Sequence, residues 1–87
     1  MNLSVVLPIY NEKINVKNFI KTIHSINKRT EIIAVDNNSD DGSNFEIKKT
    51  NAKYFFCRKR GYGAAIKLGL SKATKDYIAI CEPDGTF

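Results

Sequence analysis

The sequence contains no apolar run that approaches the roughly 20 residues needed to span a membrane. Its longest apolar stretch near the start, residues 3–9, is interrupted by Ser4 and Pro8. No basic region precedes this stretch, and no small-residue cleavage site follows it. The sequence therefore predicts neither a membrane-spanning helix nor a secretory signal.

Cysteine is scarce and tryptophan is absent. The two cysteines, Cys57 and Cys81, each end an apolar run, without Cys-x-x-Cys spacing and without a histidine nearby. We expect two buried, reduced thiols of the kind found in cytosolic proteins. Repeats, low-complexity tracts and linkers are also absent, so the 87 residues form one domain at most.

Acidic residues are outnumbered, with 9 Asp and Glu against 14 Lys and Arg, which gives a net charge of +5. The basic residues are spread along the chain apart from one cluster, Arg58-Lys59-Arg60. This balance suits an anionic ligand or an acidic membrane surface. Nucleic-acid binding is not predicted, because no aromatic platform accompanies the charge. The hydrophobic content of 43% is that of a globular protein.

Short apolar runs alternate with helical patterns. The runs that predict strands are residues 3–7, 31–35, 53–57 and 77–81. The apolar stripes that predict helices are Val16, Phe19, Ile20, Ile23 and Ile26, then Ala65, Ile66, Gly69, Leu70 and Ala73. A weaker pattern around Phe45 and Ile47 predicts a short helix within residues 42–49. The order predicts a Rossmann-like α/β three-layer sandwich with a mainly parallel four-stranded sheet.

Each predicted strand is followed by polar residues and turn formers. These exits are residues 8–12, 36–43, 58–63 and 82–85. Each has a structural explanation when taken singly. Asn11 could cap a helix, residues 36–43 could form a turn, the basic triplet could be solvated, and residues 82–85 could leave the sheet through a turn. Because ligands bind beyond the carboxyl ends of parallel strands, the four together predict one functional edge.

The residue types at this edge suit a nucleoside diphosphate and a divalent cation. Glu82 and Asp84 are hard oxygen ligands for Mg²⁺ or Mn²⁺, with ligand phosphates completing the shell. The Tyr10 ring can pack on a base, and polar groups within residues 36–39 can accept hydrogen bonds from a base or ribose. The basic triplet can neutralise a diphosphate, and Gly61 and Gly63 open a helix whose N–H groups favour an anion.

These motifs resemble those of the family 2 glycosyltransferases with the GT-A fold. The matching segments are residues 4–12, 35–43, 60–66 with Gly69, and 76–85. Each motif alone is weak, whereas four in the family's order across nearly the whole chain are specific. The resemblance implies an enzyme that takes a UDP- or GDP-sugar donor with Mg²⁺ or Mn²⁺. It implies inverting transfer to an acceptor sugar or lipid phosphate in cell-envelope polysaccharide synthesis.

The resemblance also implies roles for particular residues. The implied nucleotide-sugar-binding residues are Pro8, Tyr10, Glu12, Asp36, Asn37, Asn38, Ser39, Arg60, Gly61 and Gly63, and the implied metal ligands are Asp84 and Glu82. The sequence departs from the family pattern at Glu82, the first position of the D-x-D metal motif, and at Asn37, where many relatives have Asp. The implied location is cytoplasmic, extending to peripheral association with the inner face of the membrane.

The resemblance makes residues 1–87 the nucleotide-sugar-binding part of a GT-A domain, truncated before the acceptor-binding half. The catalytic general base is therefore expected beyond Phe87. Alone, this piece is expected to bind donor weakly, to transfer no sugar and to self-associate through exposed apolar surface. Two alternatives stay open. One is a non-catalytic nucleotide-binding module; the other is a dinucleotide-dependent oxidoreductase, suggested by Gly61-Tyr62-Gly63 but with Ile66 at the third glycine position.

Overall fold

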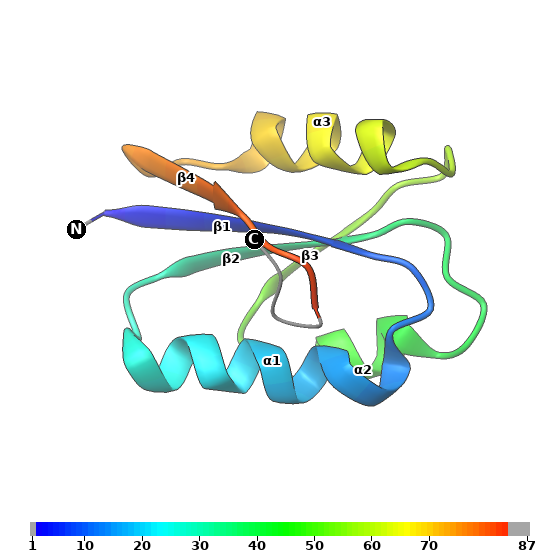
Figure 1. The fold of residues 1–87 in the computed structure, drawn as a ribbon, viewed down its shortest axis with the longest axis horizontal. Coiled ribbons are helices and arrows are strands. Elements are labelled where there is room, and N and C mark those ends of the chain that lie inside the picture. Colours follow the sequence, from blue (N-terminus) through cyan, green and yellow to red (C-terminus); the bar gives the residue numbers. More distant parts are fainter. Residues whose placement is uncertain (1, 84–87) are drawn as a thin grey trace.

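A four-stranded parallel sheet organises residues 2–83, the residues described in the computed structural model (Figure 1). The strands are β1 (Leu3–Ile9), β2 (Glu31–Asp36), β3 (Lys53–Phe56) and β4 (Tyr77–Ile80). They lie in the order β3-β2-β1-β4, and every neighbouring pair is parallel. The predicted α/β architecture with a parallel sheet is confirmed.

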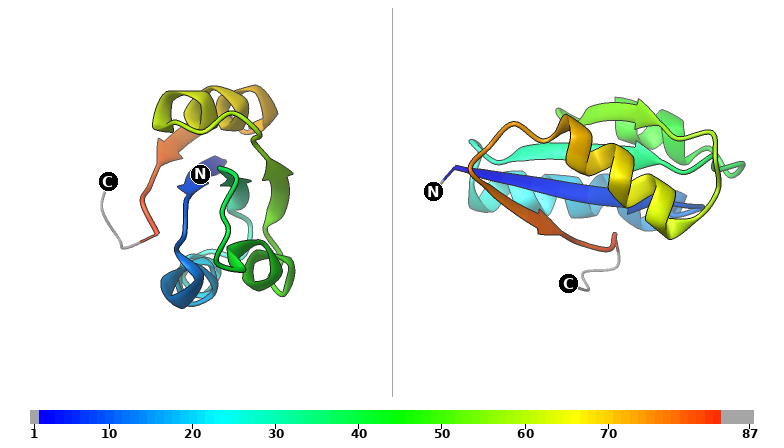
Figure 2. Two further views of the ribbon diagram at one scale, coloured as in Figure 1. Left: turned by 90° about the vertical axis from the view of Figure 1, so that its right-hand side faces the viewer. Right: turned by 90° about the horizontal axis from the view of Figure 1, so that it is seen from above.

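Three helices cover the two faces of the sheet. Helices α1 (Lys13–Ile26) and α2 (Ser43–Lys48) lie on one face, and α3 (Tyr62–Lys72) lies on the other (Figure 2). The weak pattern around Phe45 and Ile47 is therefore a helix, as predicted. No helix within residues 2–83 combines the length and apolar character needed to cross a bilayer.

The two central strands form the core. Residues 4–9 of β1 and all of β2 are buried, which is why their sequences are continuous apolar runs. One core cluster joins the sheet to Val16, Ile20 and Ile47 of α1 and α2, and a second joins it to Ala65 of α3. Cys57 and Cys81 are free and buried, as expected.

The first strand is longer than predicted, because it continues through Pro8 to Ile9. The carbonyl of Val6 accepts a hydrogen bond from the N–H of Cys81, which follows β4. The backbone of Pro8, two residues further along β1, therefore points towards the same edge as that of Val6. The pairing of β4 with β1 ends at Val6, and the N–H that proline lacks is not needed there. The third and fourth strands each end one residue earlier than predicted, before Cys57 and Cys81.

A buried carboxylate joins the strands at their amino-terminal ends. Glu31 accepts hydrogen bonds from Ser4 Oγ at 2.6 Å, from Lys53 Nζ at 2.5 Å and from both the N–H and hydroxyl of Thr74 at 2.9 and 2.8 Å. Burial raises the pKa of Glu31, but these hydrogen bonds outweigh it and lower the pKa to about 2. The ionised side chain therefore ties β1, β2, β3 and the loop before β4 together.

Gly69 allows α3 to approach the sheet closely. A Cβ at this position would overlap the side chain of Val6 and lie 3.2 Å from Val35 Cγ2. We expect Gly69→Ala to lower the free energy of unfolding by about 1–3 kcal/mol in urea denaturation, through overpacking. Gly63→Ala is the matched control, because a Cβ there meets nothing within 4 Å. Equal effects of the two substitutions would contradict the close packing of α3.

Glu31 should make the protein sensitive to acid. Because its pKa is depressed in the folded state, its contribution is complete above the ordinary value of 4.5 and is lost as pH falls towards about 2. Glu31→Gln should lower the free energy of unfolding by about 1–2 kcal/mol at neutral pH. The stability of this variant should also decline less than that of the original protein as pH falls through this window, as measured by urea denaturation at several pH values. Glu46→Gln, at the exposed pair with Lys49, is the control and should change little.

Candidate functional site

Loops from all four strands converge at the carboxyl edge of the sheet, where they surround a cleft of about 410 Å³. The lining residues come from the exits of β1, β2, β3 and β4 in turn. They are Pro8, Ile9, Tyr10, Glu12, Asn37, Arg60, Gly61, Tyr62, Glu82 and Pro83. The single functional edge predicted from the polar strand exits is therefore a real cleft.

The backbone at this edge is unusual. The residues with positive φ among those described are Asn11 at 53°, Asn38 at 59°, Gly42 at 92° and Gly61 at 134°. All four lie in the loops that follow β1, β2 and β3. Positive φ is costly for residues other than glycine, so surrounding contacts must hold Asn11 and Asn38 in place.

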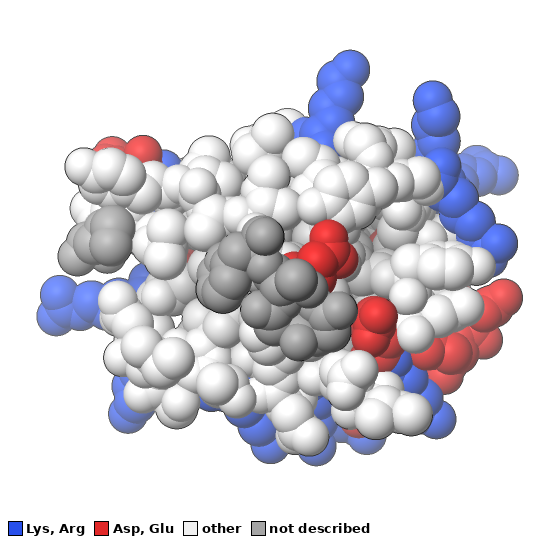
Figure 3. All heavy atoms as spheres, viewed as in Figure 1, with Lys and Arg blue, Asp and Glu red and all other residues white. Residues whose placement is uncertain are grey.

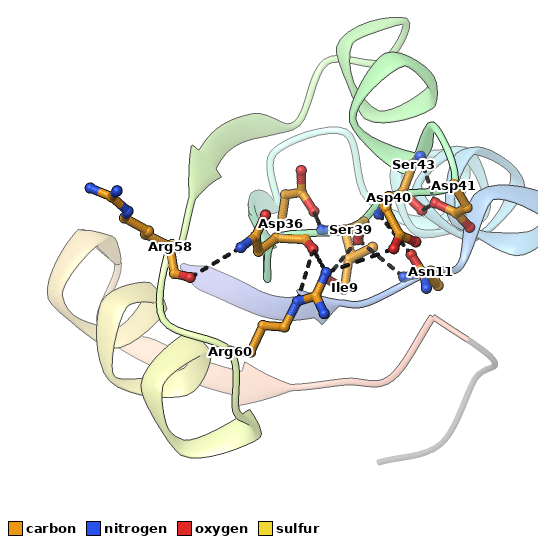
Figure 4. A network of polar contacts seen from close by, with 10 residues as sticks. Ile9, Asn11, Asp36, Ser39, Asp40, Asp41, Ser43, Arg58 and Arg60 are labelled. Carbon is orange, nitrogen blue, oxygen red and sulfur yellow. Dashed lines mark hydrogen bonds and ion pairs between the residues drawn. The ribbon is translucent and has the colours of Figure 1, made fainter.

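Hydrogen bonds between the loops after β1 and β2 supply these contacts for Asn11 (Figure 4). The hydroxyl of Ser39 accepts from the Asn11 N–H at 3.0 Å and donates to the Ile9 carbonyl at 3.4 Å. The side chain of Asn11 in turn accepts from the Asp40 N–H at 3.0 Å. Asn11 is therefore a loop-to-loop link, and its alternative role as a helix cap is wrong.

The amino terminus of α1 is capped by residues that are distant in sequence. Asp41 Oδ2 accepts from the Lys13 N–H at 3.1 Å, and Ser43 Oγ accepts from the Glu12 N–H at 3.0 Å. Ser43 Oγ also donates to Asp41 Oδ1 at 2.5 Å. Burial raises the pKa of Asp41, but the bonds from Ser43 and Lys13 outweigh it and lower the pKa. The loop after β2 thus positions the start of α1.

Asp36 lies beneath the cleft and does not line it. Its side chain is buried, with Oδ1 accepting from the Ser39 N–H at 3.0 Å and Oδ2 accepting from the Tyr54 hydroxyl at 2.8 Å. Burial, followed by the hydrogen bond and charge of Asp36, raises the pKa of Tyr54 to about 12. Both carboxylate oxygens are therefore engaged within the protein.

Asn37 presents an unused acceptor to the cleft. Its Nδ2 donates to the Gly61 carbonyl at 2.8 Å, which fixes the orientation of the amide. Its Oδ1 is buried and has no hydrogen-bond partner within residues 2–83. An unpaired buried oxygen is costly, so a donor from a bound molecule would find a prepared partner here.

Arg60 spans the mouth of the cleft. Its Nε and Nη2 donate to the Asn38 carbonyl at 3.3 and 3.0 Å, and its guanidinium carbon lies 5.1 Å from the centroid of the Tyr10 ring. A weaker ion pair at 3.8 Å joins it to Asp40. In Figure 4 the side chain of Arg58 points away from this network, and only its carbonyl takes part, accepting from Asn38 Nδ2. Of these two arginines, Arg60 alone lines the cleft.

The structure separates the predicted site residues into two groups. The predicted residues that line the cleft are Pro8, Tyr10, Glu12, Asn37, Arg60, Gly61 and Glu82, and those that do not are Asp36, Asn38, Ser39 and Gly63. Asp84 lies outside the described residues. Ile9, Tyr62 and Pro83 also line the cleft, although the sequence motifs did not single them out. Tyr62 stands between the two glycines of the predicted motif, a signal that was available. A hydrogen bond to Glu82 raises the pKa of its hydroxyl.

The cleft carries both signs of charge. Glu12 and Glu82 contribute carboxylates and Arg60 a guanidinium. Within residues 2–83 no cluster of three or more Asp, Glu, His or Cys side chains could hold a metal by itself. Of the predicted metal ligands, Glu82 lies in this cleft, and its carboxylate is the kind of hard oxygen ligand that divalent cations prefer.

The parallel sheet with its cleft at the carboxyl edge has the GT-A glycosyltransferase fold. The chain superposes on the crystal structure of mannosyl-3-phosphoglycerate synthase from Rubrobacter xylanophilus with a TM-score of 0.87 and 26% sequence identity. The match covers 97% of this chain and 31% of that protein. It also superposes with a TM-score of 0.87 on a mannosyltransferase from Pyrobaculum calidifontis that was solved in complex with GDP-Man and Mn²⁺. That match covers 98% of this chain and 28% of the mannosyltransferase, at 21% sequence identity.

Residues 4–87 match the model of glycosyl transferase family 2, and the chain belongs to that family. It is 30% identical to dolichol-phosphate mannosyltransferase of Saccharomyces cerevisiae over 92 residues, which cover 93% of this chain and 34% of the relative. The chain thus spans about a third of the length of the relatives it matches. The predicted family is confirmed, and membership argues against the oxidoreductase alternative.

The distant cap on α1 can be tested by substitution. We expect Asp41→Ala to lower the free energy of unfolding by about 1–2 kcal/mol, because the first turn of α1 and Ser43 lose their acceptor. The neighbouring Asp40→Ala is the control; among residues 2–83 its side chain makes only the 3.8 Å pair with Arg60, so the change should be below about 0.5 kcal/mol. Hydrogen exchange at the Lys13 amide should accelerate in the first variant alone.

Proposed function

We propose that this chain is the nucleotide-sugar-binding part of a longer glycosyltransferase. The donor is a UDP- or GDP-sugar, bound together with Mg²⁺ or Mn²⁺. The observation that carries the proposal is the cleft at the carboxyl edge, where a buried acceptor without a partner in the described residues, a cation stacked on an aromatic ring and carboxylates come together. Nucleotides bind at this edge in parallel α/β sheets.

The base is proposed to bind between Tyr10 and Asn37. Tyr10 is 47% exposed, so its ring has a free face for stacking. Because the amide nitrogen of Asn37 already donates to Gly61, its oxygen can only accept. Uracil and guanine each present a ring N–H to such an acceptor, which supports a UDP- or GDP-sugar. Asp36, Asn38 and Ser39 would act beneath the base by holding the loop in shape.

The diphosphate is proposed to lie beside Arg60 and the start of α3. The guanidinium can donate to phosphate oxygens while it remains stacked on Tyr10. Gly61 precedes the first turn of α3, whose free N–H groups and dipole favour an anion, and Gly63 leaves room for its approach. Pro8 and Glu12 would complete the wall of the donor site.

Glu82, with Asp84 just beyond the described residues, is proposed to hold the divalent cation. When bound, the cation would stabilise the negative charge on the departing diphosphate. The longer side chain of Glu82 still offers a hard carboxylate oxygen. The mannosyltransferase from Pyrobaculum calidifontis, solved with GDP-Man and Mn²⁺, supports this assignment by likeness of fold.

The proposed reaction is transfer of the sugar with inversion. An acceptor oxygen attacks the anomeric carbon, the bond to the diphosphate breaks, and a carboxylate base beyond Phe87 takes the proton. The acceptor is a sugar hydroxyl or a lipid phosphate, the latter supported by the dolichol phosphate in the name of the yeast relative. We place the reaction in cell-envelope polysaccharide synthesis, on the cytoplasmic side and at the inner face of the membrane when the acceptor is a lipid.

Exposed Tyr77 and Ile78 on the edge strand β4 support self-association of the chain.

Calorimetric titration of the chain with GDP and UDP tests the proposal. We expect binding that requires Mn²⁺ or Mg²⁺ and is abolished by EDTA, with no sugar transfer by the chain alone. Arg60→Ala should weaken binding about tenfold, because a charge-assisted contact to phosphate is lost. Arg58→Ala is the matched control and should change the affinity less than about twofold, because its side chain points away from the network.

Three results would contradict the proposal. The first is nucleotide binding that is indifferent to metal. The second is an equal loss of affinity in the two arginine variants, which would reduce the effect to net charge. The third is tighter binding of NAD than of either diphosphate, which would restore the dinucleotide alternative.

A further inference from the structure

A second hollow, of about 700 Å³, lies at the opposite, amino-terminal edge of the sheet. We call it the basic groove. Its walls are the end of α1, the loop into β2, the turn between α2 and β3, and the loop before β4. The cationic residues that line it are Lys21, Lys28, Arg29, Lys49, Lys53 and Lys75.

The groove accounts for the charge of the whole protein. Its lining contains six Lys or Arg residues and one acidic residue, Glu31, a formal charge of +5. The complete chain also has a net charge of +5, so all other residues together are neutral. In Figure 3 basic side chains follow the lower margin of the molecule and also project at its left edge and upper right, while acidic side chains show at the right, near the centre and at the upper left.

Most of these cations have no internal partner. Glu31 is buried and pairs with Lys53, and Lys49 pairs with Glu46. In the described part of the chain the remaining four make no ion pair within 4.0 Å; they are Lys21, Lys28, Arg29 and Lys75. They come from two segments, residues 21–29 and the loop that holds Lys75, which the fold brings together. Like charges gathered in one hollow repel each other, and a bound anion would relieve that repulsion.

We propose that the basic groove binds a phosphate-bearing polyanion, either clustered phospholipid headgroups or a soluble polyphosphate. Lysine and arginine both bind phosphate oxygens. The lining contains no Phe, Tyr or Trp on which a nucleic-acid base could stack. The site lies at the other edge of the sheet from the donor cleft and shares no lining residue with it.

The test uses amide NMR of the chain titrated with inorganic tripolyphosphate, and sedimentation with vesicles of phosphatidylglycerol or of phosphatidylcholine alone. We expect tripolyphosphate to shift amides around residues 21–31, 49–53 and 74–75. Lys28→Glu and Lys75→Glu, in two separate walls, should each weaken binding about tenfold, because a cation near the phosphates is reversed. Lys67→Glu, exposed on α3, makes the same change in net charge elsewhere and should weaken it less than about twofold.

The two arms identify the source of the phosphate. Binding of tripolyphosphate with this variant pattern supports a soluble polyanion, and the same pattern with phosphatidylglycerol vesicles supports a lipid surface. No binding in either arm, shifts confined to the carboxyl-edge loops, or an equal effect of Lys67→Glu would overturn the proposal. Titration with GDP and Mn²⁺ should be unchanged by Lys28→Glu, so the basic groove and the donor cleft can fail independently.

Discussion

The parallel pairing of β1 with β2 is the constraint on which the rest of the structure depends. Six registered pairs, from Ser4 with Glu31 to Ile9 with Asp36, hold two strands that are buried on both faces. A slip of one residue would turn every core side chain towards the wrong face, so this register is strongly determined. Because both strands run the same way, their carboxyl ends must open at one edge and their amino ends at the other.

The donor edge shows how this geometry creates a site. The loops leaving β1 and β2 adopt positive φ at Asn11 and Asn38. Hydrogen bonds to the loop after β2 hold Asn11, and hydrogen bonds with Arg58 and Arg60 in the loop after β3 hold Asn38. Buried Asp36 supports the arrangement from below through Ser39 and Tyr54. The polar residues beneath the cleft therefore serve shape. The buried Asn37 oxygen has no partner within residues 2–83, and the Arg60 guanidinium has N–H donors beyond the two that it gives to the Asn38 carbonyl. A site held in this way needs little rearrangement on binding.

The two edges of the sheet differ in charge as well as in position. The donor edge combines Glu12, Glu82 and Arg60 in a cleft of mixed sign, whereas the amino edge is almost wholly cationic. Glu31 is the acidic residue in the lining of the basic groove, and its hydrogen bonds bind the strands together. We propose negatively charged ligands for both edges, and the proposed chemistry differs: recognition of a nucleotide at one edge and attraction of phosphates by accumulated charge at the other.

The local sequence pattern was sufficient to predict the helices and strands, their order along the chain and the edge that carries the candidate site. Strands buried on both faces are continuous apolar runs, and amphipathic helices have apolar residues at helical spacing, so both can be recognised from residue types alone. Only the tertiary structure could divide the predicted residues into those that line the cleft and those that support it. Asp36 and Asn37 are adjacent and polar, yet one is enclosed by Tyr54 and the other faces the cleft. The sequence pattern also did not predict that Asp41 caps α1 or that one groove is lined by Lys21, Lys28 and Lys75. Both features bring together residues that are far apart in the chain. Composition and periodicity determine the secondary structure of each segment and which of its faces is buried. Which distant side chains come into contact is decided by how the segments pack.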